Sequence, residues 1–594
     1  MHLTFLDYAI IGGLFSAVLG IGLWASRTSG SSTSAYFLSN KNMPWWLLGF
    51  SMVATTFSTD TPNLVTDIVR TNGVSGNWVW WAFLLTGLLT VFVYAQLWRR
   101  SDVSTDMEFY ELRYGGKPAR FLRWFRAFYL GVVFNVMAMA AVTLAAIKIG
   151  QVMLGLSPVQ TVLIAGSITV VFSAIGGFRG VIYTDFLLFF FAMAGSIGAA
   201  IYLVQLPEVG GLSQLLTHEN VQGKLSLFPD TNDPNAVVML LVIPLAVQWW
   251  SAWYPGAEPG GGGYIAQRML AAKNEHHAMG ATFFFNVLHY ALRPWPWILV
   301  ALASLVVFPD IQSIQDAFPQ VDASKLGQDL AYSAMLTKLP AGLMGLVLAS
   351  LGAAYMSTIS THLNWGASYL INDVYRLGVG KNASEAQLVR TGRWATLGLM
   401  FLSALLALAL TSALQLFEII LMFGAGTGLI FILRWFWWRV NAWSEIAAMV
   451  SSGITSIALQ FGPLSLILFG PEGVLPAWGK YPLVVATTTI IWLLVTWVTP
   501  AESKETLQRF VDQVQPGGPG WKDYPTQKGQ GLPWMVPQGI TAMIWGALMV
   551  YGALFSTGYA LYGDGQVLAI SASITGISAL MLLRTWRKIS RLWR

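Results

Sequence analysis

Apolar stretches long enough to cross a lipid bilayer recur along almost the whole chain. A helix needs about 20 predominantly apolar residues to span the hydrocarbon core of a membrane. Of the 594 residues, 55% are hydrophobic and only 10% are charged, whereas soluble domains carry roughly 25% charged residues. The sequence therefore predicts an all-α polytopic membrane protein with about 15 transmembrane helices.

The segments between these stretches differ in charge, which predicts the orientation of the chain. Residues 99–126 hold seven arginines and lysines. In the segments 205–235 and 309–329, by contrast, most of the charged residues are acidic. Because short cytoplasmic loops are enriched in lysine and arginine, we expect 99–126 inside the cell, the N-terminus outside and the C-terminus inside. The other basic clusters then also fall in inner loops, including those at Arg179, Arg268 and Arg434. The expected location is the bacterial cytoplasmic (inner) membrane.

Several absences narrow the classes of function. The chain has no cysteine, which excludes disulfides, thiol catalysis and iron–sulfur clusters. It has no GxxxxGK[ST] motif, which argues against an ATP-driven pump. The net charge of +6 is explained by the inner loops, so we expect no nucleic-acid partner. Residues 1–24 lead into RTSGSSTS rather than a small-residue cleavage site, so we expect a transmembrane helix there and no signal peptide.

A membrane enzyme is the alternative from a different class. Its candidate site is NEHHAM (274–279), where Glu275, His276 and His277 lie together at the predicted start of a helix. The spacing differs from the HExxH pattern of metalloproteases. We therefore interpret these residues as a solvated helix start and expect no enzymatic activity.

Two of the apolar stretches are interrupted by residues that break helices. The second contains FSTDTPN (57–63), and the seventh ends in SAWYPGAEPGGGGYIAQR (251–268), with two prolines and four consecutive glycines. When stretches 2 to 6 and 7 to 11 are compared as two halves, each break falls in the first helix of its half. Paired broken helices at corresponding positions indicate a transporter with its binding site near the middle of the membrane.

The stretch MSTISTHLN (356–364) carries many polar side chains inside an otherwise apolar helix. A single serine or threonine in a membrane helix usually bonds to the backbone or to a neighbouring helix, but a cluster on one face favours an ion site. Sodium, like other hard cations, prefers oxygen ligands, and the broken second stretch exposes carbonyls around Ala54 and Phe57. Within an arc of roughly 160° at 3.6 residues per turn lie Ala354, Ser357, Thr358, Ser360, Thr361 and Asn364.

Asp185 is an ionisable residue in the sixth stretch, within GGFRGVIYTDFLLFFF. A carboxylate inside a membrane is costly and usually marks a functional site, so we interpret Asp185 as part of an ion site. The alternative is a structural role in which Asp185 pairs with Arg179. Lys148 is a further candidate partner, unless its side chain extends to the membrane surface.

Five sequence motifs occur together across residues 40–440. They are PWWLLGFSMVATTFST (44–59), STDMEFYELRYGG (104–116), FSAIGGFRGVIYTD (172–185), YIAQRMLAAKN (264–274) and AAYMSTISTHLNWGASYLINDVYR (353–376). In this order and at this spacing they resemble the sodium:solute symporter family, the group that includes sodium-coupled sugar, proline and sialic acid transporters. The resemblance implies a leucine-transporter-like core of two inverted five-helix repeats, with accessory helices on both sides.

On this basis we divide the chain into a core and accessory parts. The first repeat is expected at 44–235 and the second at 236–440. A polar, Pro/Gly-rich cytoplasmic loop, with a short amphipathic helix around 501–514, is expected at 500–536. The accessory parts are the first transmembrane helix with its cytoplasmic loop (1–43), further transmembrane helices (441–499), and the last helices with a basic tail (537–594).

The resemblance also implies ion sites, and with them sodium as the coupling ion, bound at one site or at two. The principal sodium site corresponds to Ala54, Phe57, Ala354, Ser357 and Thr358. Some members of the family hold a second sodium, and the matching residues here are Asp185, Ser357, Thr358, Ser360 and Thr361.

Solute contacts in the family come from the first, second, sixth and tenth core helices. The matching candidates are Thr56, Asp60, Thr61, Gln248, Trp249, Ser251, Trp253, Tyr254 and Phe417. Sugar-transporting relatives carry a different amide and acid pattern on the first helix, which argues against a hexose pocket. Asp60 has an alternative interpretation, as part of a solvated outer cluster with Asp67 and Arg70.

The predicted function is sodium-coupled secondary active symport that imports a small polar organic solute by alternating access. The alternatives are a proton-coupled transporter of the same fold, in which Asp185 titrates, and a transporter-like sensor or channel without coupled uptake. The solute is left open among sugars, sugar acids, amino acids and small carboxylates. The expected surroundings are the lipid bilayer, with no obligate protein partner and a functional monomer.

Overall fold

The protein is built almost entirely of helices. The computed structural model describes residues 3–29, 33–251, 258–319, 321, 326–410, 413–470, 475–527 and 533–591, without the side chains of 26–29, 33, 35, 174–176, 413–419 and 477. Within these residues there is no β-strand, and one isolated bridge joins Met43 to Ala272.

The first half of the chain contains long, short and interrupted helices. They are α1 (Phe5–Ser29), α2 (Thr33–Leu38), α3 (Trp45–Thr55), α4 (Asp60–Asn72), α5 (Trp78–Trp81), α6 (Leu84–Leu89), α7 (Ala95–Ser101), α8 (Phe109–Arg113), α9 (Gly116–Phe128), α10 (Asn135–Ile149), α11 (Pro158–Val204), α12 (Leu212–Thr217) and α13 (Glu219–Gln222). Wider π-helical turns continue several of them: η3 (Thr90–Tyr94), η4 (Tyr129–Phe134) and η5 (Gly150–Leu154).

The second half repeats this mixture of long, short and interrupted helices. They are α14 (Pro234–Val237), α15 (Gly263–Ala271), α16 (Glu275–Val287), α17 (Pro294–Val307), α18 (Ile311–Ala317), α19 (Leu330–Leu336), α20 (Leu343–Tyr369), α21 (Glu385–Ala409), α22 (Ala413–Leu433), α23 (Ala442–Phe461), α24 (Pro463–Phe469), α25 (Lys480–Val498), α26 (Lys504–Val514), α27 (Val536–Tyr562) and α28 (Gly565–Arg591). The π-helical turns here are η6 (Val238–Val242), η7 (Pro244–Gln248), η8 (Leu288–Leu292) and η10 (Leu370–Tyr375).

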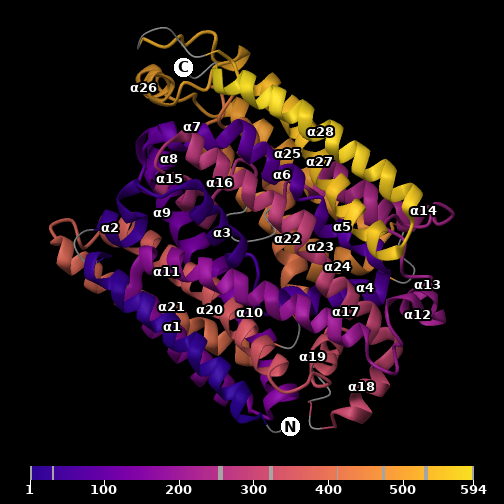
Figure 1. The fold of residues 1–594 in the computed structure, drawn as a ribbon. Coiled ribbons are helices and arrows are strands. Elements are labelled where there is room, and N and C mark those ends of the chain that lie inside the picture. Colours follow the sequence, from indigo (N-terminus) through magenta and orange to yellow (C-terminus); the bar gives the residue numbers. More distant parts are fainter. Residues whose placement is uncertain are drawn as a thin grey trace.

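The described residues contain eleven helical segments that are long and apolar enough to cross a membrane, and four shorter apolar ones. The prediction of an all-α polytopic membrane protein is therefore confirmed, while the count of transmembrane helices stays a prediction. Figure 1 shows the N- and C-terminal ends at opposite ends of the bundle, with α27 and α28 running side by side along one edge.

Both predicted helix breaks are visible. The first broken helix consists of α3, which ends at Thr55, and α4, which begins at Asp60. The second consists of the consecutive segments η6 and η7, the latter ending at Gln248, and of α15, which begins at Gly263. Residues 252–257 of the second break lie outside the described residues, but Gly260, Gly261 and Gly263 have φ of 87°, 79° and 53°. Glycine adopts such angles without steric cost, which explains why this break is rich in glycine.

Glycine divides two apolar regions of the chain into separate helices. The label α11 covers two helices that meet at a kink, where Gly177 has a φ of 57°, as the separate apolar stretches 158–175 and 181–204 predict. The apolar run over 330–371 predicts one long helix, but it forms α19 and α20, because the chain turns at Gly342 with φ of 83°. Apolar composition alone does not show where such a run divides.

The segment after α25 packs against the same end of the bundle as α7 and α8. Its helix α26 buries Leu507, Phe510, Val511 and Val514. The ring of Phe510 lies 5.9 Å from that of Phe109 and 5.4 Å from that of Trp521, measured between centroids. This segment, which is predicted to be a cytoplasmic loop, is thus anchored to the membrane domain by one apolar helix face.

We expect Phe510→Ala to release α26 from the bundle. Truncation of a buried phenylalanine costs about 3–5 kcal/mol, and the ring of Phe510 makes aromatic contacts with Phe109 and Trp521 that hold this short helix in place. Limited digestion of the purified protein with proteinase K should then cut within 500–536 faster than in the wild type. The matched control is Lys504→Ala on the exposed side of α26, and equal cleavage rates for the two variants would contradict the prediction.

Candidate functional site

The first broken helix contacts the hydroxyl-rich face of α20 at its break. The hydroxyl of Thr358 donates to the carbonyl of Thr55 at 2.8 Å and lies 3.3 Å from the carbonyl of Phe57. Carbonyls at the end of a helix lack intrahelical partners, and one α20 hydroxyl reaches two of them. All five residues predicted for the principal sodium site are at most 2% exposed: Ala54, Phe57, Ala354, Ser357 and Thr358.

The chemistry of this contact fits a hard cation. Its atoms are carbonyl and hydroxyl oxygens, which are the ligands that such cations prefer. Ser357 donates its proton to Asp185 at 2.6 Å, and a hydroxyl that donates its proton keeps two lone pairs as an acceptor. The principal sodium site stays a prediction, and the donor set at the Thr358 contact supports it.

Asp185 lies at the centre of a second polar cluster, in which both of its oxygens are engaged. Oδ1 accepts from Ser357, and Oδ2 accepts from Ser51 at 2.5 Å and forms an ion pair with Arg268 at 3.5 Å. The two basic residues considered as alternative partners of Asp185 have other contacts. Arg179 lies over the ring of Trp24, and Lys148 bonds to Asp329 at 2.7 Å. Asp185 therefore lies beside Ser357, a predicted residue of the principal sodium site, and is not the partner of Arg179 or Lys148.

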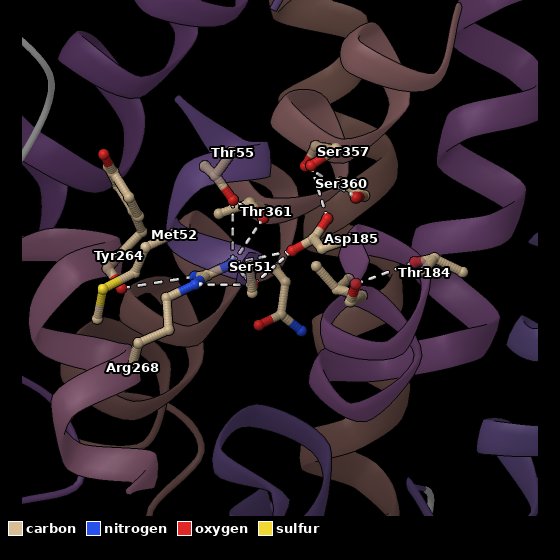
Figure 2. A network of polar contacts seen from close by, with 12 residues as sticks. Ser51, Met52, Thr55, Thr184, Asp185, Tyr264, Arg268, Ser357, Ser360 and Thr361 are labelled. Carbon is tan, nitrogen blue, oxygen red and sulfur yellow. Dashed lines mark hydrogen bonds and ion pairs between the residues drawn. The ribbon is translucent and has the colours of Figure 1, made fainter. Parts of the chain in front are cut away.

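Arg268 is the most important residue that the sequence pattern misplaced. Its charge put it in an inner loop, but it is 0% exposed and reaches into the bundle from α15. Figure 2 shows its guanidinium among Ser51, Thr55, Thr361 and Asp185. The signal that could have located it is its place in YIAQRMLAAKN, directly after the break, where a helix must cross the protein interior.

A second buried arginine, Arg293, bonds to other carbonyls of the first break than Thr358 does. Arg293 donates to the carbonyl of Val53 at 2.7 Å and to that of Thr56 at 2.8 Å. The hydroxyl of Thr56 donates to the carbonyl of Val53 at 2.9 Å. Thr56, a predicted solute contact, is thus part of the structure of the break.

The other predicted solute contacts are spread over two regions. Asp60 and Thr61 interact locally with Ser58. Gln248 donates to the carbonyl of Val79 at 2.9 Å and lines a cavity of about 280 Å³. Of the remaining candidates, Ser251 is buried, and the backbone carbonyl of Trp249 accepts a hydrogen bond from Thr86. Trp253, Tyr254 and the side chain of Phe417 lie outside the described part of the structure.

A smaller chamber lies deeper, between α6, α15 and α16. Its volume is about 20 Å³, roughly the space that one water molecule needs. Its polar lining includes Thr86, Thr90 and Asn286, and the Asn286 side-chain oxygen is buried with no hydrogen-bond partner in the described structure. A Cβ at Gly87 would lie 1.8 Å from this oxygen, so any other residue there would displace the side chain of Asn286. The sequence pattern did not identify these residues, because single threonines and asparagines in helices carry no periodic signal.

The chamber is closed at the α9 end by a buried network of charges. Glu258, which also lines the chamber, accepts from Arg126 at 2.6 and 2.7 Å and pairs with Arg434 at 3.5 Å. Arg434 in turn pairs with Glu445 at 3.3 Å. These four side chains are at most 4% exposed, although both arginines were predicted to lie in inner loops.

The candidate enzyme site has structural contacts instead. Glu275 pairs with Arg100 at 2.9 Å, and His277 accepts from the backbone amide of Trp45 at 3.0 Å. Among the described residues, no group of three or more His, Cys, Asp or Glu side chains is arranged so that it could hold a metal ion.

Comparison with known proteins assigns the family. The model of the sodium:solute symporter family matches residues 36–452. The chain belongs to the sodium:solute symporter family. It is 25% identical over 481 residues to a sodium/glucose cotransporter of Vibrio parahaemolyticus, covering 78% of this chain and 87% of that protein. It is 30% identical over 415 residues to a sodium/myo-inositol cotransporter of Canis lupus familiaris, covering 65% of this chain and 56% of that protein.

The structure resembles that of a sodium-coupled sialic acid symporter, with a TM-score of 0.66, 19% sequence identity, and coverage of 84% of this chain and 99% of that one. The predicted leucine-transporter-like fold is thereby confirmed. Membership of the sodium:solute symporter family likewise confirms the predicted function of sodium-coupled solute symport.

The Glu258 network gives a test of these buried charges. Glu258→Gln leaves Arg126 and Arg434 without their shared carboxylate, and breaking a buried ion pair costs about 3–5 kcal/mol. We expect a clear fall in the melting temperature of the purified protein, followed by tryptophan fluorescence.

The matched control is Glu208→Gln. Its pairing with Lys338 at 3.5 Å is largely exposed, and exposed pairs contribute at most about 1 kcal/mol. Equal shifts in melting temperature for the two variants would argue against a buried network.

Proposed function

We propose that this sodium-coupled symporter imports a small neutral polyhydroxylated solute, a sugar or a polyol. The observation that carries the proposal is the lining of the deep chamber, which has a volume of about 20 Å³ in this closed form and must widen to admit a solute. It combines hydroxyl and amide groups with aromatic rings, and its described lining residues include no lysine or arginine. Such a lining offers hydrogen bonds and apolar faces to a sugar, but no counter-charge to a free carboxylate.

Glu258 adds to this preference. Its carboxylate lines the chamber and is neutralised by Arg126 and Arg434, so it offers oxygen atoms that accept hydrogen bonds from solute hydroxyls. The first broken helix contributes no residue to the described lining, so its departure from the sugar-transporter pattern does not bear on this chamber. The names of the relatives from Vibrio parahaemolyticus and Canis lupus familiaris, which specify glucose and myo-inositol, support the same class of solute.

We propose that coupling depends on the contact between α20 and the first broken helix. Sodium bound at the principal site supplies a positive charge shared by the carbonyls of the break and the hydroxyls of α20. Entry of one positive charge releases about 2.3 kcal/mol per 100 mV of membrane potential, and a tenfold concentration gradient adds about 1.4 kcal/mol. The chain's own part is to hold the Thr358 hydroxyl against the carbonyls of Thr55 and Phe57.

The two barriers around the chamber support import by alternating access. Toward the 280 Å³ cavity, the barrier includes the hydrogen bond from Gln248 to Val79 and that from Thr86 to Trp249. Toward the basic loops, the barrier is the buried network around Glu258. With the predicted orientation, the weaker barrier faces outward, and the direction of transport is set by the sodium gradient and the membrane potential. We place the chain as a functional monomer in the bacterial cytoplasmic membrane, with its N-terminus outside.

Thr358→Ala tests the coupling contact. Loss of the hydroxyl removes one oxygen ligand and its bond to Thr55, and we expect the sodium concentration for half-maximal uptake into proteoliposomes to rise about tenfold or more, which corresponds to about 1.4 kcal/mol. Because coupling between two bound ligands is reciprocal, solute affinity should fall at fixed sodium. Thr358→Ser keeps the hydroxyl and should stay close to the wild type; an unchanged sodium dependence in Thr358→Ala would contradict the assignment.

The solute class is tested with glucose and myo-inositol against lactate and proline. In sodium buffer, we expect the neutral polyols to raise the melting temperature and to be taken up, and the two charged solutes to have no effect. Asn286→Leu removes the unpartnered side-chain oxygen of the chamber and should abolish polyol uptake, whereas Gln508→Leu on α26 should not. Sodium-dependent uptake of lactate or proline in place of the polyols would refute the solute class but not sodium symport.

A further inference from the structure

The guanidinium of Arg268 occupies a position surrounded by oxygen atoms. Its Nη2 lies 2.9 Å from the hydroxyl of Thr361, 3.0 Å from that of Ser51, 3.2 Å from that of Thr55 and 3.5 Å from Oδ2 of Asp185. These oxygens come from α3, α11 and α20, while Arg268 belongs to α15. All five residues are at most 1% exposed. Figure 2 shows the oxygens converging on one end of the guanidinium.

This arrangement does not fit a second sodium bound by the predicted residues. Asp185 would supply the negative charge of that site, but Arg268 already neutralises it. A further cation beside Asp185 would also lie next to a guanidinium, and repulsion between like charges is strong in a buried, weakly polar environment. Arginine keeps its charge in proteins, so deprotonation does not relieve this repulsion.

The remaining predicted ligands are also directed elsewhere. The hydroxyl of Ser360 donates to the carbonyl of Ser357 in its own helix, at 3.1 Å. The hydroxyl of Thr358 donates to the first broken helix. Of the five predicted residues, Asp185 and Thr361 lie around the guanidinium, and Ser357 bonds to Asp185 on the side of the principal site.

The position of the guanidinium is fixed from behind as well. It lies 5.4 Å from the ring centroid of Phe178 and 5.5 Å from that of Tyr264. Nη1 lies 3.5 Å from the carbonyl of Tyr264 and 3.4 Å from the side-chain oxygen of Gln267. Contacts on every side hold the charge at the oxygen cluster.

We propose that Arg268 is a tethered cation in place of a second sodium, so that this transporter couples one sodium to each solute. The inference deepens the proposed function and rests on sodium binding at the principal site. The guanidinium joins α15 to α3, α11 and α20, which is the cross-linking that a bound cation would provide. Because it is covalently attached, it contributes this link without drawing on the sodium gradient.

The direct test is equilibrium binding of radioactive ²²Na⁺ to the purified, full-length protein. We expect one sodium per chain in the wild type and two in Arg268→Gln, where Asp185 and its hydroxyls have lost their cation. The second sodium should disappear again in Arg268→Gln combined with Asp185→Asn. A parallel readout is the melting temperature as a function of sodium concentration, whose slope increases with each further ion bound by the folded protein.

Two controls separate the charge at this position from general effects of losing an arginine. Arg268→Lys keeps a positive charge on α15 and should bind one sodium. Arg434→Gln removes a buried arginine from the network around Glu258 and should also bind one.

Each outcome has a distinct meaning. Two sodium ions in the wild type, or one in a folded Arg268→Gln, would overturn the inference. If Arg268→Gln does not fold, the wild-type count alone decides between one and two. No sodium bound to the wild type, together with sodium-independent uptake, would refute the proposed function itself.

Discussion

The structure depends on the requirement that backbone groups exposed by a broken helix be satisfied inside a membrane. Lipid offers no hydrogen bonds, so non-helical backbone at membrane depth is tolerated only where the protein supplies partners. Around the first break these partners come from two sides. The hydroxyl of Thr358 reaches the carbonyl of Thr55 from α20, and Arg293 reaches the carbonyls of Val53 and Thr56. The break is thereby a fixed point at which α20 and the chain around Arg293 meet.

The same requirement explains why the interior contains so many charges. Charged residues within a membrane are costly unless they pair with one another or with carbonyl groups. Arg268 pairs with Asp185, Arg293 with carbonyls, and Arg126 and Arg434 with Glu258 and Glu445. Each group joins helices that are distant in the sequence. Partnered charges therefore define the contacts between the broken helices and the rest of the bundle.

The sequence predicted the features that depend on local pattern. Long apolar stretches gave the helices, Pro62 and the glycines after residue 259 gave the two breaks, and the repeated hydroxyls gave the buried face of α20. It did not predict partners, which depend on how distant helices pack. Arg268 was read as a loop residue because charge at the end of an apolar stretch is typical of loops, and the chamber around Asn286 left no periodic trace. The principal sodium residues are a prediction that the contact of Thr358 supports.

The two barriers around the chamber differ in the type of interaction that closes them. Two hydrogen bonds contribute to the barrier at Gln248 and Thr86, and each such bond typically contributes about 0.5–1.5 kcal/mol to stability. The opposite barrier consists of four paired, buried charges. Opening it separates these charges, and leaving one of them unpaired costs about 3–5 kcal/mol. Glu258 belongs both to this network and to the lining of the chamber. On the proposed function, a solute whose hydroxyls bond to Glu258 would compete with Arg126 and Arg434 for the same carboxylate, which would link occupancy of the chamber to opening of the stronger barrier.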